Sequence, residues 1–265
     1  MSQGNYYDNI ASIYDQTRWM SESVAEEVAD FIVELINAKP DTSFLEPGVG
    51  TGLNVLPLVK RGYSVTGIDI SQEMLDQFSN KLKGIPPNLT LIQADASHLS
   101  FPDHSFDVVL TVHMVHTVSH WQRFLDEIER VLKSGGFYLN AQWITPPARM
   151  EFESYFKAIL AKGTNTPASS PRHTGNREIS VEDYFSKKGY RSNYAVAKKW
   201  LVSNTVEELL GFLKVRAYGL CWRSSDEEFE QALNEFEAFC LRHYSSLTTE
   251  ILSEAQFEIW TYQIS

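Results

Sequence analysis

The sequence predicts an α/β fold in which a doubly wound, mostly parallel sheet is covered by helices on both faces. Short apolar segments typical of buried strands recur at regular intervals through the first half of the chain, and amphipathic helical patterns fall between several of them. Strands and helices that alternate in this way form βαβ units, whose crossovers place the strands parallel to one another. The expected strands are residues 43–46, 64–69, 89–94, 106–112 and 137–143.

Three helices before and between these strands are predicted from apolar spacing and from the polar residues at their starts. The first begins near Ser23, where Glu26 three residues later completes the pattern of a capping box. The second follows Ser71, a residue type that favours the N-cap position. The third begins at another expected capping box, Ser119 with Gln122.

The alternating pattern stops at Pro146-Pro147, so we expect two domains. A core is expected to consist of residues 1–145 together with 251–265. A mainly helical lobe, residues 146–250, is expected to be inserted into it. The features expected beyond residue 145 are a loop at 163–176, helices capped by Thr205/Glu208 and Ser225/Glu228, and a late strand at 257–262.

The acidic composition argues against a nucleic-acid partner. The 265 residues contain 23 Lys and Arg against 34 Asp and Glu, a formal net charge of −11, whereas nucleic-acid surfaces need clustered cations. No apolar run approaches the ~20 residues that span a bilayer, so membrane insertion is not expected. We therefore expect a small-molecule partner, and the sequence leaves the oligomeric state open between a monomer and a homodimer.

Two further observations favour a cytoplasmic protein. The chain does not start with a basic segment followed by an apolar one, so no secretory signal is expected. Its two cysteines, Cys221 and Cys240, are too few for a disulfide scaffold and are expected to be reduced thiols. No cluster of His, Cys, Asp and Glu has the spacing of a metal site, so no metal is expected.

The strongest local motif is Glu46-Pro-Gly48-Val-Gly50-Thr-Gly52, which joins an expected strand to an expected helix. Glycines let the backbone approach a ligand closely, and the crevice beyond the strand ends of an open α/β sheet binds ligands. A dinucleotide fingerprint would place its third glycine at position 53, which is Leu53 here, and the Lys-Ser/Thr pair of a phosphate loop is missing. A plain glycine turn is the alternative interpretation.

Two aspartates end the next two expected strands. A carboxylate at Asp69 is placed to accept hydrogen bonds from both hydroxyls of a ribose. Asp95 could accept a hydrogen bond from an adenine amino group, while Ala96 presents its backbone N–H to the same base. The alternative for each aspartate is a structural cap of a loop or helix, a role that Ser71 could share with Asp69.

Through these motifs the chain resembles the class I S-adenosylmethionine-dependent methyltransferases, in the subgroup related to ubiquinone and menaquinone biosynthesis. The resemblance covers about residues 5–143 and implies a Rossmann-like sheet of seven strands with S-adenosylmethionine as cofactor. The matching segments are FLEPGVGTG (44–52), GIDISQEM (67–74), QADASHLSFPDHSF (93–106), FDVVLTV (106–112), EIERVLKSGG (127–136) and the Tyr14-Asp15 pair.

The resemblance also assigns residues to the amino-acid end of the cofactor. It implies that Gly48, Gly50 and Gly52 pass under the methionine part of the cofactor. Glu46 would face the ammonium group of that part, directly or through water.

The same resemblance assigns residues to the nucleoside. Asp69 would hold the ribose, and Ile70 and Met74 would flank the adenine. Asp95 and Ala96 would contact the edge of the adenine, which agrees with the interpretation from the residues alone.

Aromatic and basic side chains near the N-terminus are candidates to close over the site. Tyr14, Arg18 and Trp19 precede the first long helix, and aromatic faces stabilise a nearby cation such as a sulfonium. The alternative is that these aromatic side chains simply pack against the sheet.

His113 and His116, just past the fourth expected strand, are the candidate catalytic residues. In methyl transfer the protein mainly aligns acceptor, methyl carbon and sulfur, an effect worth ~7–11 kcal/mol in well-oriented systems. Imidazole titrates near neutral pH, so one histidine could act as general base. The alternative is a histidine hydrogen-bonded to nearby backbone, and a carboxylate acceptor would need no base.

The lobe is expected to supply the acceptor pocket. Aromatic side chains beside arginines would suit an amphipathic or carboxylate-bearing acceptor, although the aromatic side chains could equally form the core of the lobe. The candidates are Trp200, Phe212, Tyr218, Trp222, Arg172, Arg177, Arg216 and Arg223.

Three other functions compete with small-molecule methylation. A non-catalytic module could bind S-adenosylmethionine or S-adenosylhomocysteine without transferring a methyl group. A nicotinamide oxidoreductase is disfavoured by the glycine spacing, and methylation of nucleic acid is disfavoured by the net charge of −11.

Overall fold

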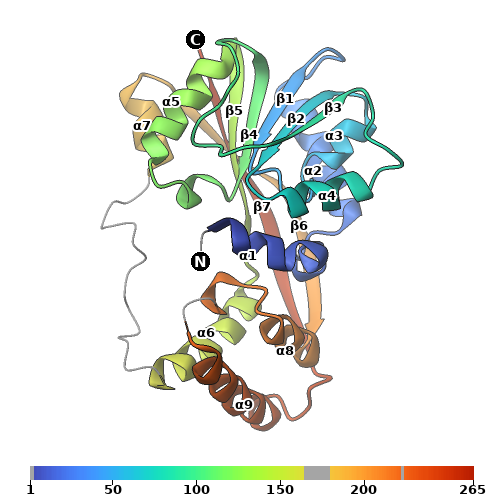
Figure 1. Cartoon of the computed structure of the whole chain (residues 1–265), viewed down its shortest axis with the longest axis vertical. Helices are drawn as coiled ribbons and strands as arrows, with labels where there is room; N and C mark the ends of the chain where they lie inside the picture. The colour runs from blue at the N-terminus through green and yellow to red at the C-terminus, as the bar shows by residue number, and fades with distance from the viewer. Residues whose placement is uncertain (1–2, 164–179, 222–223) are drawn as a thin grey trace. The chain divides into compact units, whose positions relative to one another are not determined.

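The residues that the computed structural model describes, 3–163, 180–221 and 224–265, contain seven strands in one sheet. Across the sheet the strands are ordered β3-β2-β1-β4-β5-β7-β6 (Figure 1). They are β1 (Ser43–Pro47), β2 (Ser64–Asp69), β3 (Leu89–Gln93), β4 (Phe106–Val112), β5 (Leu132–Ile144), β6 (Ser192–Thr205) and β7 (Glu250–Gln263). The prediction of a doubly wound α/β fold with seven strands is confirmed.

The first five strands run parallel to one another, and β7 runs in the opposite direction. β1 pairs in parallel with β2 and with β4, β2 pairs with β3, and β4 pairs with β5. Ile264, just after β7, exchanges backbone hydrogen bonds of 2.6 and 2.9 Å with Gly135 and Gly136 near the start of β5. Glu258, earlier in β7, contacts Gln142 near the end of β5. β7 is therefore antiparallel to β5, and the sheet is mostly parallel, as predicted.

The order of the strands reverses between β1 and β4. The chain starts at β1, moves outward to β2 and β3, and then returns to β4 on the opposite side of β1. At such a reversal the two connections leave in opposite directions, which opens a crevice beyond the carboxyl ends of the two strands. The candidate site is therefore expected at the carboxyl ends of β1, β2 and β4.

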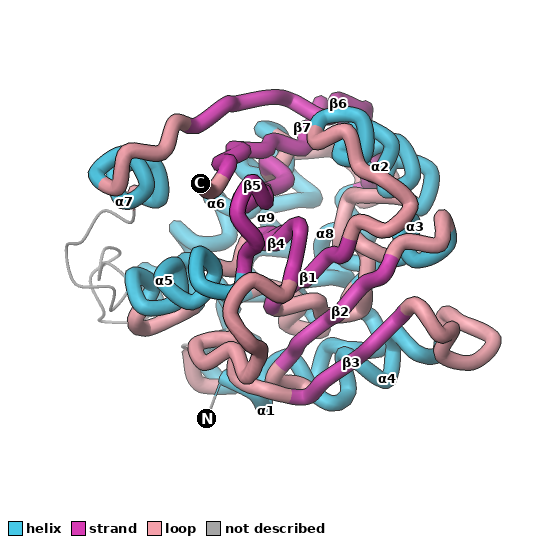
Figure 2. Tube along the Cα trace, turned by 90° about the horizontal axis from the view of Figure 1, so that it is seen from above, coloured by secondary structure: helices cyan, strands magenta, loops and turns pink. Residues whose placement is uncertain are grey.

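Helices cover both faces of the sheet. Figure 2 shows α5 and α7 on one side and α2 and α3 on the other. None of the described helices is long and apolar enough to cross a bilayer. The α-helices are α1 (Gln3–Ile10), α2 (Glu22–Leu35), α3 (Leu56–Lys60), α4 (Gln72–Asn80), α5 (Trp121–Val131), α6 (Pro147–Gly163), α7 (Val181–Lys187), α8 (Val206–Lys214) and α9 (Asp226–His243). Short 3₁₀ helices are η1 (Ala11–Ile13), η2 (Asp15–Thr17), η3 (Val115–Thr117) and η4 (Gly219–Cys221).

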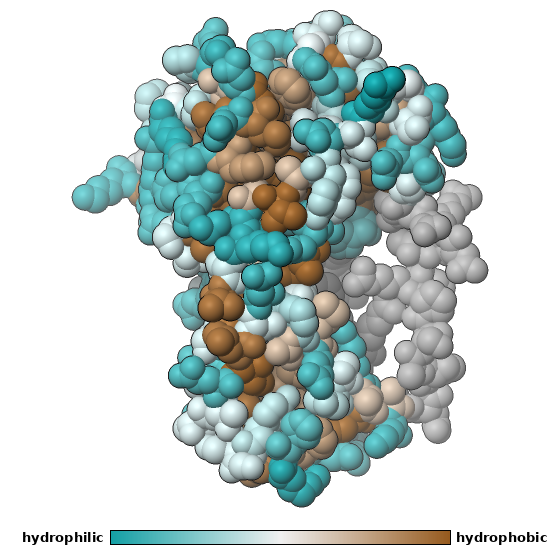
Figure 3. Space-filling model, turned by 180° about the vertical axis from the view of Figure 1, so that it is seen from behind, coloured by the Kyte–Doolittle hydropathy of each residue, from teal (hydrophilic) through white to brown (hydrophobic). Residues whose placement is uncertain are grey.

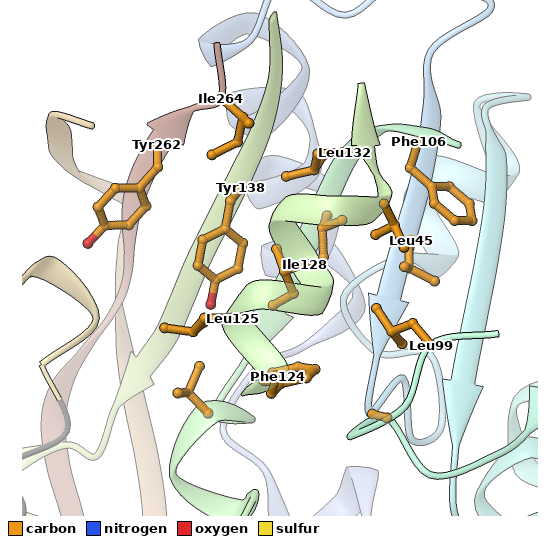
Figure 4. Close-up of a cluster of buried hydrophobic side chains, with 14 of the residues drawn as sticks. Leu45, Leu99, Phe106, Phe124, Leu125, Ile128, Leu132, Tyr138, Tyr262 and Ile264 are labelled. Carbon is orange, nitrogen blue, oxygen red and sulfur yellow. The ribbon is translucent and has the colours of Figure 1, made fainter. Parts of the chain in front are cut away.

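The apolar stripe of α5 packs onto the sheet beside β5 and β7. Phe124, Leu125 and Ile128 belong to a fully buried cluster that also contains Tyr138 and Tyr262 (Figure 4). The rings of the two tyrosines stack with their centroids 5.8 Å apart. This cluster fixes the antiparallel strand β7 against the parallel part of the sheet.

The chain divides into two compact units. Unit 1 comprises Met1–Trp143, Glu178–Lys198 and Phe257–Ser265, and unit 2 comprises Ile144–Arg177 and Lys199–Gln256. The inserted lobe was expected to span residues 146–250, so α7 and the first half of β6 depart from that expectation. The physical reason is that Phe185 of α7 is fully buried in the cluster around Tyr138.

Unit 2 has a core of its own, built mainly from α6, α8 and α9. Its buried side chains include Phe152, Phe156 and Phe236, whose rings contact one another. Both expected capping boxes are present at the starts of α8 and α9, with Thr205/Glu208 and Ser225/Glu228. Most of the loop predicted at 163–176 lies outside the described residues.

β6 was not predicted, and the lobe is less helical than expected. Side-chain contacts pair Lys199 with Glu254 and Ser203 with Glu250, so β6 runs antiparallel to β7. Leu201 and Leu252 are exposed on the parts of these strands that belong to unit 2. A half-exposed strand at the sheet edge lacks the buried apolar run by which the central strands are recognised.

Two predicted helix starts are wrong. The N-cap of α2 is Ser21, whose hydroxyl accepts a 3.3 Å hydrogen bond from Val24 N, and not Ser23. The N-cap of α5 is His120, which makes no capping hydrogen bond through its side chain, so the expected box of Ser119 and Gln122 is not formed. Both observed N-caps lie within two residues of the predicted ones.

Apolar side chains also reach the surface. On the face shown in Figure 3, brown apolar patches lie among polar side chains. Among the described residues, the large apolar side chains that are exposed include Ile70, Ile85, Met150, Leu201 and Leu252.

Phe124→Ala tests the cluster beneath α5. The Phe124 ring is fully buried, so the substitution should lower the free energy of unfolding by about 3–5 kcal/mol. Ile85→Ala removes an apolar side chain that is 56% exposed and should change it by less than about 0.5 kcal/mol. Urea unfolding followed by circular dichroism measures both, and equal losses would contradict this description of the core.

Candidate functional site

The glycine segment turns across the crevice edge at the end of β1. The backbone N–H groups of Gly48 and Val49 both donate to the carbonyl oxygen of Ile68 in β2, at 2.7 and 2.9 Å. The turn after β1 is therefore hydrogen-bonded to β2. The helix that follows, α3, begins only at Leu56 and carries Pro57 in its first turn, where proline removes no helical hydrogen bond. The expected helix after the glycines is therefore present, but it begins four residues after Gly52.

Two of the three motif glycines are required by packing. All three have positive φ values, +74° at Gly48, +54° at Gly50 and +74° at Gly52. A Cβ on Gly52 would lie 2.5 Å from the ring of Phe78, and one on Gly48 would lie 2.5 Å from Sδ of Met114. A Cβ on Gly50 would meet nothing within 4 Å. Gly50 is therefore the glycine whose backbone faces open space at the crevice.

Asp69 links the turn after β1 to the turn after β2. Its Oδ2 accepts a 2.8 Å hydrogen bond from Gly50 N, and its Oδ1 accepts one of 2.9 Å from Ser71 N. Burial raises the pKa of Asp69, and the hydrogen bonds from Ser71 and Gly50 oppose that shift. A carboxylate oxygen can accept more than one hydrogen bond, so both oxygens keep acceptor capacity for a ligand. Ser71 itself caps α4, as predicted.

Glu46 lies beneath the glycine turn and is 1% exposed. Asn54 Nδ2 donates a 2.8 Å hydrogen bond to its Oε1. Among the described residues, neither Glu46 Oε2 nor Asn54 Oδ1 has a hydrogen-bond partner, although both atoms are buried. Burial, together with the nearby charge of Asp69, raises the pKa of Glu46 to about 8. A buried polar atom without a partner is uncommon and indicates a place where a ligand atom fits.

The predicted adenine residues are not equally accessible. Ile70 is 48% exposed at the crevice end of β2, whereas Met74 is 1% exposed and packs with Ile10 and Ala11. Asp95 is exposed. Its Oδ1 accepts a 2.8 Å hydrogen bond from Ser97 N, so Asp95 caps a turn. Ala96, the next residue, is buried. Ile70 therefore offers the open apolar surface at this edge, and Met74 supports the segment behind it.

The N-terminal segment is anchored on the same turns by two acids that sequence reasoning did not single out as site residues. Asp8 accepts a 2.6 Å hydrogen bond from the hydroxyl of Ser71. Asp15 accepts one of 2.5 Å from the hydroxyl of Thr51 and also forms an ion pair with Lys81. Because Asp8 and Asp15 lie seven residues apart, they fasten the segment to both turns that Asp69 links.

Tyr14 and Arg18 lie next to each other on this segment. The guanidinium carbon of Arg18 sits 4.0 Å from the centre of the Tyr14 ring, in a cation–π arrangement. The Nε atom of Arg18 is buried and has no hydrogen-bond partner among the described residues. The ring of Trp19 packs edge-on against Trp143, with centroids 6.3 Å apart. Trp19 therefore packs against the end of β5, the alternative that its sequence position left open.

His113 is held by backbone at the end of β4. Its Nε2 lies 2.9 Å from the carbonyl oxygen and 3.1 Å from the nitrogen of Trp143. Burial and the neighbouring His116 lower the pKa of His113 to about 4, so the imidazole is neutral at physiological pH. His113 also has a positive φ of +53°, a conformation that costs energy in a residue with a side chain. This geometry favours the structural interpretation of His113 over that of a general base.

A cavity of about 170 Å³ opens beside the two histidines. Its polar lining includes the amides of Asn140 and Gln142 on β5, two residues that the strand period places on one face. Gln142 Nε2 donates a 3.2 Å hydrogen bond to Glu258, which also accepts one of 2.9 Å from the Tyr194 hydroxyl. The described residues around the cavity are His113, Met114, Val115, His116, Asn140, Ala141, Gln142, Val181 and Trp260.

This cavity adjoins the glycine turn through Met114. The Met114 side chain lines the cavity and also contacts Gly48. Sequence reasoning missed Asn140, Gln142 and Trp260. The polar-apolar alternation along residues 138–143 is a signal that could have found Asn140 and Gln142. The glycine turn and the cavity therefore lie on either side of one methionine.

Three of the residues proposed for an acceptor pocket in the lobe, Phe212, Tyr218 and Arg216, make contacts within unit 2. Phe212 and Tyr218 pack against the core of unit 2, and the buried guanidinium of Arg149 lies 4.7 Å from the Tyr218 ring. Arg216 pairs with Asp226. These contacts correspond to the alternative in which the aromatic side chains form a core. Arg172, Arg177, Trp222 and Arg223 lie outside the described residues, and Trp200 lies on β6.

Several known proteins that are similar to this chain are methyltransferases. Residues 45–140 match the family described as a methyltransferase domain. The demethylmenaquinone methyltransferase of Clavibacter sepedonicus is 30% identical over 172 residues, which cover 62% of this chain and 69% of that protein. The phosphatidylethanolamine N-methyltransferase of Cereibacter sphaeroides is 45% identical over 94 residues, which cover 35% of this chain and 46% of that protein. The match with the latter therefore spans less than half of that relative.

A solved structure shares the fold at low identity. The phosphoethanolamine N-methyltransferase 2 of Haemonchus contortus, in complex with phosphomonomethylethanolamine and S-adenosylhomocysteine, is 16% identical with a TM-score of 0.55. The similarity covers 99% of this chain and 59% of that chain. At this identity the similarity concerns the arrangement of the elements alone.

Gly52→Ala tests the packing of the glycine turn, with Gly62→Ala as the matched control. Both positions have positive φ, +74° and +89°, so each alanine should lose about 1–2 kcal/mol of unfolding free energy. Only the alanine at 52 meets a ring, that of Phe78, which should add about 1–3 kcal/mol. Urea unfolding gives both values; equal losses would show that the contact with Phe78 does not restrict the turn.

Proposed function

The chain belongs to the class I S-adenosylmethionine-dependent methyltransferases, and we propose that it methylates a small-molecule acceptor bound in the cavity beside His113. The observation that carries this proposal is the position of Met114, which separates that cavity from the glycine turn by one side chain. A cofactor at the turn and an acceptor in the cavity would then meet beside the Met114 side chain, which borders both. We place the donor on the turn and the acceptor in the cavity.

The residues at the turn fit the cofactor. Glu46 offers a buried carboxyl oxygen without a partner, which suits the ammonium of the amino-acid end. Gly50 leaves open space where a side chain would stand, so backbone and ligand can meet closely. Gly48 and Gly52 shape the same turn through their own contacts. These observations support the assignment of the methionine end to Glu46 and the glycine turn.

The nucleoside is proposed to lie at the end of β2. Asp69 keeps acceptor capacity on both carboxylate oxygens, which suits the two hydroxyls of a ribose. Ile70 supplies an exposed apolar surface for one face of the adenine. Asp95 with Ala96 remains the proposed partner of the adenine edge, and Met74 is proposed to support this region from behind rather than to touch the base.

Tyr14 and Arg18 are proposed to border the cofactor from the N-terminal segment. That segment is fastened to the turns after β1 and β2 by Asp8 and Asp15. The unpartnered Nε of Arg18 and the ring of Tyr14 would then face a ligand that carries both a carboxylate and a cation.

The proposed chemistry is an in-line displacement in which the protein aligns the reactants. When bound, S-adenosylmethionine supplies a methyl group on a sulfonium, an electrophile that needs no further activation. Met114 and the rigidly held end of β4 would fix the direction of approach, since orientation alone can be worth ~7–11 kcal/mol. His113 stays neutral, and its Nε2 is engaged with the backbone of Trp143, so we propose a positioning role for it. The exposed His116 remains the candidate base for acceptors that must lose a proton.

The cavity favours an uncharged or cationic acceptor group. The described residues that line it include no Lys or Arg, while Asn140 and Gln142 offer neutral hydrogen-bonding amides. Its volume of about 170 Å³ is below the roughly 300–1,000 Å³ of pockets that enclose a whole drug-sized ligand. We therefore propose that only the reacting head of the acceptor enters.

Location and partners follow from the charge and the cysteines. We propose a cytoplasmic protein, because the two cysteines are free and buried. A net charge of −11 supports a small-molecule acceptor over nucleic acid. A monomer and a homodimer both fit the proposal.

Methyl transfer from labelled S-adenosylmethionine to a panel that includes phosphatidylethanolamine and demethylmenaquinone tests the function. For any acceptor that is methylated, Gln142→Ala should raise the acceptor KM at least tenfold, because the cavity loses an amide held in place by Glu258. Gln72→Ala, on the exposed start of α4, is the control and should leave KM unchanged. Cofactor binding without methylation of any acceptor would favour the non-catalytic module instead.

Asp69→Ala tests the proposed nucleoside site. Loss of the carboxylate should weaken binding of S-adenosylhomocysteine at least tenfold, because it removes the proposed partner of the ribose and frees Gly50 N and Ser71 N. Asp76→Ala removes an exposed carboxylate of α4 and should leave the affinity within twofold. Titration calorimetry measures both, with circular dichroism as the check on folding; equal affinities for the two variants would refute the assignment.

A further inference from the structure

Glu46 is a buried acid without a cation. It stands at the carboxyl end of β1 and is 1% exposed, with Oε1 bound to Asn54 and Oε2 unpartnered among the described residues. None of the ion pairs formed by the described residues includes Glu46. Transfer of an ionised carboxylate from water into such a site is costly, so a carboxyl group without a cation tends to take up a proton.

The charged groups packed around Glu46 add to this tendency. From β2, the carboxylate of Asp69 acts on Glu46 and disfavours a second negative charge. Asp69 in turn is affected by Asp8 of the N-terminal segment. Arg18 on that segment acts on Tyr7 and on His113. On the β4 side the neighbour of the turn is the uncharged Met114. No described cation therefore compensates a charge on Glu46.

We propose that Glu46 carries a proton in the free protein and releases it to solvent when the cofactor binds. The inference rests on the proposed cofactor site, in which the ammonium of the amino-acid end lies against this carboxyl group. The O–H bond of Glu46 breaks, the proton passes to the buffer, and the resulting carboxylate pairs with the ammonium. Binding of the cofactor is then coupled to one ionisation inside the fold.

The direction of the coupling follows from the two states of Glu46. In the free protein its pKa is about 8, so at pH 7 about nine-tenths of the molecules carry the proton. A cation beside the carboxylate lowers its pKa in the complex. The affinity for the cofactor should therefore rise with pH up to about 8, by nearly tenfold per unit where the proton must be released. Above that pH Glu46 is already ionised in the free protein, so the affinity for the cofactor no longer rises with pH.

Titration calorimetry at pH 7.0 in buffers of different ionisation enthalpy counts the protons released. S-adenosylhomocysteine is the ligand, since its amine is largely an ammonium at this pH. We expect a net release of close to one proton per site at pH 7.0, where Glu46 of the free protein is mostly protonated and the ligand is mostly an ammonium ion. Glu46→Gln should bind the ligand more weakly and release none.

5′-Methylthioadenosine is the matched control ligand. It carries the ribose and the adenine but not the amino-acid end, so it should bind without releasing a proton. Release with this ligand would place the proton on Asp69 and overturn the proposal. Release that persists in Glu46→Gln would overturn it as well.

The outcomes separate this inference from the proposed function. Binding of S-adenosylhomocysteine to the unmodified chain without proton release would refute the role of Glu46 and leave the cofactor site standing. No binding of either ligand to the unmodified chain would refute the proposed function itself. If Glu46→Gln fails to fold, the two ligands decide with the unmodified chain at pH 7.0. Release with S-adenosylhomocysteine but not with 5′-methylthioadenosine supports the proposal, and release with both ligands or with neither overturns it.

Discussion

The two hydrogen bonds that the Asp69 carboxylate accepts connect the two turns that border the crevice. One comes from Gly50 N in the turn after β1 and the other from Ser71 N in the turn after β2. Because β1 and β2 are parallel neighbours, these turns emerge side by side at one edge of the sheet. Asp8 and Asp15 fasten the N-terminal segment to the same two turns. The floor of the site and the segment that borders it therefore depend on one carboxylate.

The crevice contains several acidic side chains, which differ in how a negative charge on each is stabilised. Asp69 is stabilised by backbone N–H groups, and Asp15 is paired with Lys81. Glu46 is buried without a cation. A ligand that brings positive charge completes such an arrangement, whereas the phosphates of a dinucleotide would oppose it. The charge distribution of the crevice and the position of the third glycine are independent observations, and both argue against a dinucleotide.

Local patterns made much of this structure predictable. The first four strands, the N-cap at Ser71 and the glycine turn follow from apolar runs and from residue types with strong local preferences. What the sequence could not give depends on contacts between distant segments. The partnership of Asp8 with Ser71, the placement of α7 through Phe185 and the cavity beside Met114 all belong to this class. The edge strand β6 was not predicted because none of its residues is fully buried, so it has no buried apolar run.

A crystal structure of the protein with S-adenosylhomocysteine tests the central claim most directly. We expect the ribose hydroxyls within hydrogen-bond distance of Asp69 and the amino group against Glu46, with the sulfur directed toward Met114 and the cavity. Density for the ligand elsewhere, or an empty crevice at saturating ligand concentration, would contradict it.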